Sequence, residues 1–191
     1  IIAIFVGISL VNKEIERRTI YTLMARPISR ASFIMGKYLG LALTLFVNMA
    51  IMWAVFLLTL WLYHVSIQPS IFQAVALIFV EILVVTAIAL FFSTFTSTTL
   101  SAIFTLGLYV IGHLTADLRA MVANSDSGPI KSLVDLLYYL CPNLEMLNIK
   151  GQAAVGVVAA PEYVMLASLY GVMYAGVLLI SACVVFQQRD F

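Results

Sequence analysis

The sequence predicts an all-α protein, a polytopic bundle of membrane-spanning helices, and three observations support this prediction. The 191 residues are 63% hydrophobic and 10% charged, whereas an ordinary soluble domain has about 25% charged residues. The mean hydropathy is +1.09. Several uncharged runs are close to or above the ~20 residues that a helix needs to cross a bilayer. These properties indicate the lipid bilayer as the surroundings of the chain, and the net charge of +1 gives no reason to expect a nucleic-acid partner.

The chain begins with an apolar segment, residues 1–10, which is too short to cross a bilayer by itself. It has no initiator methionine and no basic region before it, so it does not resemble a signal peptide. We therefore interpret residues 1–10 as the second half of a membrane helix, and we expect the natural protein to start further upstream.

Residues 11–30 form the most charged loop of the chain. Six of the ten Lys and Arg residues lie between Lys13 and Lys37. Pro27 interrupts any helix through the loop, because it has no N–H and disfavours helical geometry at the residue before it. Ser29 can cap a following helix, which is then expected to start near Arg30.

Four later segments are expected to cross the membrane. The first, residues 38–63, is uncharged and would measure about 39 Å as a helix, longer than the roughly 30 Å hydrocarbon core, so we expect a tilted span. The other three are residues 71–92, 97–115 and 163–186, of which 71–92 carries one charged residue, Glu81.

Between the last two spans, residues 116–162 are expected outside the membrane. Turn residues predict a loop from Asp117 to Pro129. Residues 131–140 are predicted to form an amphipathic helix that lies in the membrane interface. Its apolar face would carry four leucines opposite two charged residues: Leu133, Leu136, Leu137 and Leu140 opposite Lys131 and Asp135.

The distribution of cations predicts the orientation of the chain. If residues 11–30 are cytoplasmic, seven Lys and Arg residues lie on the cytoplasmic side and three on the other. The successive spans then place residues 116–162 on the extracytoplasmic side and the C-terminus in the cytoplasm.

The order of residues in the charged loop is more specific than its charge, since every multi-pass protein needs cations on its cytoplasmic side. The pattern Glu-x-Glu-x-x-Thr-x-x-x-Leu-x-x-Arg-Pro-Ile-Ser-Arg at residues 14–30, followed by Gly36 and Lys37, resembles the first cytoplasmic loop of ABC exporter permeases of the ABC-2 type. The Tyr-Leu-Cys-Pro-Asn-Leu-Glu stretch at residues 139–145 and the Arg-Asp-Phe ending are similar to the subgroup that includes the nitrous-oxide-reductase maturation permease.

The resemblance implies a six-span permease subunit in the cell inner (plasma) membrane, of which this chain would hold half of the second span and the third to sixth spans. It also implies a second permease copy and a separate ABC ATPase, which binds the ATP and Mg, and no cofactor on this chain. In the family, the loop holds a coupling helix that docks into a cleft of the ATPase. The matching positions are Glu14, Glu16, Arg17, Arg18, Thr19, Tyr21, Leu23, Arg26, Pro27, Ser29 and Arg30.

Glu81 is the one charged residue deep in an apolar span, and its helical neighbours offer it no partner. We therefore expect it to face the protein interior or to be protonated. One interpretation is a carboxyl group in a substrate path or gate; the other is a structural glutamate that hydrogen-bonds across helices, for example to Asn48 or His113. His113 has no second ligand at metal spacing, so no metal site is predicted.

Ala167, Gly171 and Ala175 have the spacing that lets two helices approach closely, either within the subunit or at a dimer interface. The chain has no Walker A pattern, so any nucleotide is expected on another chain. Two other classes stay open: a membrane anchor or assembly subunit without a transport path, and an intramembrane enzyme. The enzyme is disfavoured, because the chain has no Gly-x-Ser-x-Gly, no His-Glu-x-x-His and no paired intramembrane aspartates.

Overall fold

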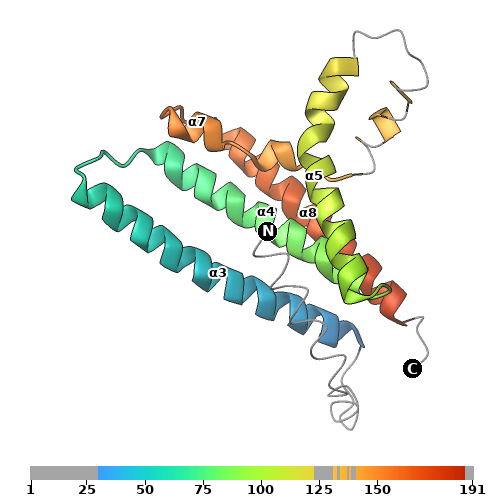
Figure 1. Cartoon of the computed structure of the whole chain (residues 1–191). Coiled ribbons are helices and arrows are strands. Elements are labelled where there is room, and N and C mark those ends of the chain that lie inside the picture. The colour runs from blue at the N-terminus through green and yellow to red at the C-terminus, as the bar shows by residue number, and fades with distance from the viewer. Residues whose placement is uncertain (1–29, 123–130, 133, 137, 139–140, 188–191) are drawn as a thin grey trace.

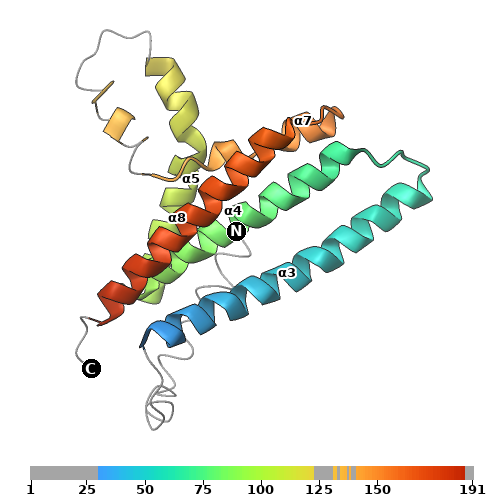
Figure 2. The ribbon, with the colours of Figure 1, turned by 180° about the vertical axis from the view of Figure 1, so that it is seen from behind.

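A computed structural model describes residues 30–122, 131–132, 134–136, 138 and 141–187. Every regular element in this part of the chain is helical, which confirms the predicted all-α class. The long helices are α3 (Arg30–Leu62), α4 (Pro69–Ser93), α5 (Thr98–Val122) and α8 (Pro161–Gln187), and two short ones, η1 (Leu144–Leu147) and α7 (Lys150–Ala154), precede α8. Figures 1 and 2 show the arrangement from opposite sides.

Within the described residues, four helices are long and apolar enough to cross a membrane: Ala31–Leu62, Pro69–Ser93, Thr98–Thr115 and Pro161–Gln187. The predicted segments 71–92 and 163–186 lie within α4 and α8, and the segments 38–63 and 97–115 lie within α3 and α5 except for Tyr63 and Ser97. Local chemistry accounts for some of the boundaries. Pro69 is the first residue of α4, where its missing N–H and fixed φ suit the helix start.

Helix α4 forms the centre of the bundle, between α3 and α8, and α5 crosses it at an angle (Figure 1). Its side chains Leu77, Val84 and Ile88 are almost completely buried. Helix α3 is different, because its buried residues, from Ile34 to Leu45, all lie in its first half. The second half of α3 exposes its apolar side chains, as expected for a surface that faces lipid.

The segment between α5 and α8 is packed into the bundle. Leu144 and Leu147 of η1 are buried against α4, α5 and α8. The backbone N–H of Asn143 donates to the Tyr170 hydroxyl of α8 at 2.9 Å. Nearby, burial raises the pKa of the Cys141 thiol above its ordinary value.

The structure bears on two predictions for this region, the loop expected from Asp117 and the amphipathic helix expected at residues 131–140. The loop expected from Asp117 is wrong up to Val122, because α5 continues to that residue; residues 118–122 contain no turn former, and the turn residues start only at Asn124. Within the predicted amphipathic helix, 131–132, 134–136 and 138 are helical. Asp135 pairs with Arg119 of α5 at 3.2 Å, and Leu136 is exposed.

The predicted half-span at residues 1–10 and the predicted coupling residues from Glu14 to Ser29 lie outside the described residues. Arg30 is the first residue of α3, as the sequence predicts.

Candidate functional site

Glu81 lies at the midpoint of α4, with Pro69 and Ser93 twelve residues before and after it. Each end of the helix is therefore about 18 Å away along the axis, and Glu81 lies near the middle of the apolar layer that α4 crosses. It is only 5% exposed. One carboxylate oxygen is 3.4 Å from His113 Nε2 of α5, and the other is 3.1 Å from Lys150 Nζ of α7. We refer to these three residues as the Glu81 cluster.

His113 lies between two acceptors. Its Nδ1 is 3.1 Å from the carbonyl oxygen of Tyr109, one turn earlier, and its Nε2 faces Glu81. The Tyr109 ring lies against the imidazole, with the ring centroids 4.6 Å apart. The imidazole therefore joins α5 to the Glu81 carboxylate of α4.

Lys150 was not among the predicted site residues, because the sequence places it in a segment outside the membrane. The structure brings its ammonium to the midpoint of α4. This is possible because the preceding segment enters the bundle at Gly112, where an added Cβ would lie 2.7 Å from the Pro142 carbonyl oxygen. An isolated charged residue in an otherwise uncharged run, such as Lys150 here and Glu81 in its span, is the signal that could have identified Lys150.

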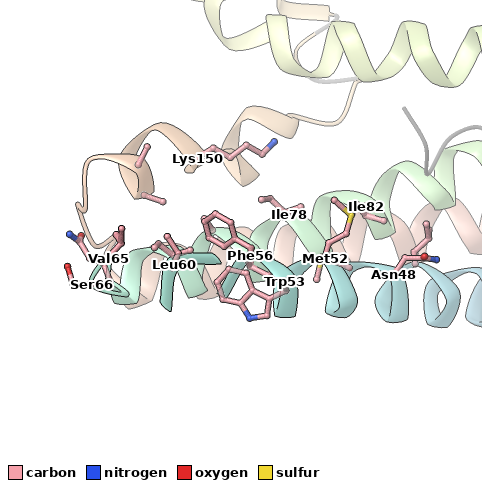
Figure 3. A pocket seen from close by; sticks show the side chains of 18 residues that line it. Asn48, Met52, Trp53, Phe56, Leu60, Val65, Ser66, Ile78, Ile82 and Lys150 are labelled. Carbon is pink, nitrogen blue, oxygen red and sulfur yellow. The ribbon is translucent and has the colours of Figure 1, made fainter. Parts of the chain in front are cut away.

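Asn48 is placed differently from its predicted role as a partner of Glu81. Its amide nitrogen donates to the Thr44 carbonyl oxygen of its own helix, at 2.9 Å. Its side chain lines a cleft of about 760 Å³ between α3, α4 and α7, and Lys150 lines the same cleft. Figure 3 shows Lys150 on α7, across from the apolar side chains of α3 and α4. Most of the lining is apolar, including Met52, Trp53, Phe56, Ile78 and Ile82.

The predicted small-residue stripe of α8 lies against α4. Ala167, Gly171 and Ala175 are all buried. A Cβ added at Gly171 would overlap with Val80 Cγ1 of α4. The sequence left open whether this stripe packs within the subunit or between subunits, and the structure places it within the subunit.

Among the residues that the structure describes, no group of three or more His, Cys, Asp and Glu side chains could hold a metal ion. The Glu81 cluster combines a buried carboxylate, an ammonium and an imidazole next to an apolar cleft.

The family model described as "ABC-2 family transporter protein" matches residues 1–191. A comparison with curated proteins finds no match.

Proposed function

Because the chain belongs to the ABC-2 family of transporter proteins, we propose that it is the permease subunit of an ATP-driven exporter of the cell inner membrane. Permeases of this family normally work with an ABC ATPase partner, which would bind the ATP and Mg. The proposal further assigns two permease copies to the assembly and a cytoplasmic C-terminus to each. The excess of cations in residues 11–37 supports this orientation.

Residues 14–30 are proposed to carry motion from the ATPase to the spans. The charged residues Glu14, Glu16, Arg17 and Arg18 supply ion pairs for a soluble partner, and Tyr21 and Leu23 supply apolar contacts. Helix α3 starts three residues after Pro27, whose ring restricts the bend between loop and span. A displacement of the docked loop would therefore tilt α3.

The Glu81 cluster is the observation that carries the proposal of a transport path. Ionisable groups in a membrane interior are costly and usually functional, and here one carboxylate contacts groups from two other elements, α5 and α7. Helix α7 is held to α4 by two polar contacts, the pair between Lys150 and Glu81 and the hydrogen bond that the Ser70 hydroxyl donates to the Ala153 carbonyl oxygen at 3.4 Å. Loss of the first contact would weaken the attachment of α7, as expected for a gate.

The test uses the full-length permease, copurified with its ATPase and reconstituted in liposomes. Glu81→Gln is expected to leave assembly intact and to change the ATPase rate that the permease stimulates, because Gln cannot hold the Lys150 ammonium by charge. Glu162→Gln, at the exposed start of α8, is the matched control. A wild-type rate in the Glu81→Gln complex would show that the carboxyl group is structural.

The coupling role is tested in the same complex. Replacing Glu14 and Glu16 with Ala is expected to leave membrane insertion intact and to lower the stimulated ATPase rate; an unchanged rate contradicts the role. If no ATPase copurifies with the permease or responds to it, the chain is instead an anchor or assembly subunit.

The subgroup is also part of the proposal. The sequence of residues 139–145 and the Arg-Asp-Phe ending support a place beside the nitrous-oxide-reductase maturation permease. Genes next to that of this chain would test this, since an adjacent ATPase gene supports the class and the other neighbours indicate the cargo.

A further inference from the structure

We propose that the cleft between α3, α4 and α7 binds an acyl-chain amphiphile with an anionic head, and that Lys150 holds the head. This inference rests on the proposed export function, since it names the class of molecule that would pass through the same site. Four observations carry it: the size and lining of the cleft, its single charge, the second partner that Glu81 has besides Lys150, and the depth of the Glu81 cluster.

The cleft has the size and lining of a site for an apolar chain. Its volume of about 760 Å³ lies within the roughly 300–1,000 Å³ of small-molecule sites. Trp53, Phe56 and Ile78 supply rigid apolar surface, and Met49 and Met52 supply flexible thioether chains that adapt to different shapes. A flexible hydrocarbon chain suits this lining.

The cleft has one charged group. Among the described residues that line it, Lys150 is the only one with a formal charge, and the polar lining is otherwise Asn48, Ser66 and Gln68. The Lys150 side chain is 47% exposed although its ammonium contacts Glu81. Part of the Lys150 side chain is therefore accessible to a ligand, and an anionic head group would complement the positive charge of its ammonium.

The Glu81 cluster can release Lys150 to such a ligand. Glu81 contacts Lys150 through one oxygen and His113 through the other. When an anionic head takes the Lys150 ammonium, the imidazole of His113 still faces the carboxylate, so Glu81 is not left without a partner. Ligand binding would thus weaken the attachment of α7 to α4, the contact proposed as the gate.

The depth of the cluster favours a transported molecule over a resident lipid. Glu81 is about 18 Å from either end of α4, and half of the hydrocarbon core is about 15 Å thick. A phospholipid in its ordinary place keeps its head in the interfacial layer, far from the Lys150 ammonium. An anionic head at Lys150 has therefore left that layer and lies partway across the bilayer.

The test measures binding to the full-length permease in nanodiscs of zwitterionic lipid, without ATP. The probe is photoactivatable hexadecyl phosphate, and photoactivatable hexadecanol is its uncharged counterpart. We expect saturable labelling of α3 and α4 peptides by the phosphate, with competition by unlabelled hexadecyl phosphate and little by hexadecanol. Ile78→Trp, which narrows the cleft, should reduce labelling.

The charge is tested by Lys150→Met, with Lys131→Met as the matched control, since Lys131 is exposed and does not line the cleft. The Lys150 variant should bind the phosphate about tenfold or more weakly, the size expected for losing one charge-assisted hydrogen bond. The Lys131 variant should bind like the wild type. The fold of the Lys150→Met protein is verified by an unchanged helix content and an unchanged elution in size-exclusion chromatography.

Two results would overturn the proposal. If the phosphate and the alcohol label the cleft equally and Lys150→Met changes neither, the cleft holds bulk lipid and does not distinguish an anionic head from a neutral one. Absence of labelling would mean that protein, such as another part of the chain or a second copy, fills the cleft. Because binding is measured without ATP, either failure leaves the ATPase test untouched, and a failed ATPase test leaves the binding result standing.

Discussion

Gly171→Ala is the substitution whose effect follows most directly from the structure. Gly171 lies on the buried stripe of α8, where an added methyl group would overlap with Val80 Cγ1 of α4 and also lie 3.5 Å from Val84 and 3.6 Å from Leu147. These neighbours are side chains of two other elements, α4 and η1. Helix packing in a membrane depends on such van der Waals fit, because lipid is as apolar as the helix surfaces.

Two opposing terms set the size of the effect. Ala is preferred to Gly in a helix by about 1 kcal/mol, whereas overpacking a tight contact costs about 1–3 kcal/mol. Gly176 lies in the same helix and has no atom within 4 Å of an added Cβ, so Gly176→Ala carries only the favourable term. Gly171→Ala should therefore be less stable than Gly176→Ala by about 1–3 kcal/mol.

The assay is unfolding of the purified permease in mixed micelles with increasing SDS, followed by helix content. Val80→Ala removes the overlapping methyl groups, so the double variant Val80→Ala/Gly171→Ala should lose most of the penalty. The expected coupling energy is about 1–3 kcal/mol, as for residues in contact. Equal stability of Gly171→Ala and Gly176→Ala, with no coupling to Val80, would refute the close approach of α8 and α4.

Three further predictions concern the segment before α8 and its contact with α5. Tyr170→Phe should lower the free energy of unfolding by about 1–3 kcal/mol in the same assay, because it leaves the N–H of Asn143 without its acceptor; a neutral result would show that water replaces the hydroxyl. Asp135→Asn should change the free energy of unfolding by less than about 1 kcal/mol, because the side chains of Asp135 and Arg119 are 37% and 43% exposed. A larger loss would mean that the ion pair stabilises the contact between this segment and α5 more strongly. The raised pKa of the Cys141 thiol lowers its thiolate fraction at neutral pH, so in a variant without the other cysteine iodoacetamide should react more slowly with folded than with unfolded protein, and faster as the pH rises. Equal rates in mass spectrometry would contradict the burial.

The spans could be predicted because membrane helices are marked by long, predominantly apolar runs. Residues 71–92 and 163–186 lie within α4 and α8 for this reason. The end of α5 could not be predicted in the same way. Once a helix leaves the apolar layer its end depends on local propensity, and residues 118–122 continue the helix until turn residues begin at Asn124.

For the candidate site, the sequence could predict the buried carboxyl group but not which residues contact it. A single carboxyl group in an apolar span must face protein, which identified Glu81, and His113 follows as one of two suggested partners. Choosing between His113 and Asn48 requires the rotation and crossing of α3, α4 and α5, which no periodicity fixes. Predicting Lys150 as a partner of Glu81 would have required knowing that the segment after α5 turns back into the bundle.

The tight contact between α8 and α4 has a mechanical consequence. The Val80 side chain fills the space that a side chain at position 171 would need. Sliding one helix along the other would therefore drive Val80 out of this space and against the neighbouring side chains of α8. The two helices are therefore expected to shift as one rigid unit, while α3, which is buried only over its first half, is free to swing. Relative motion during a transport cycle would then be concentrated along the seam between α3 and this unit, where the cleft lies.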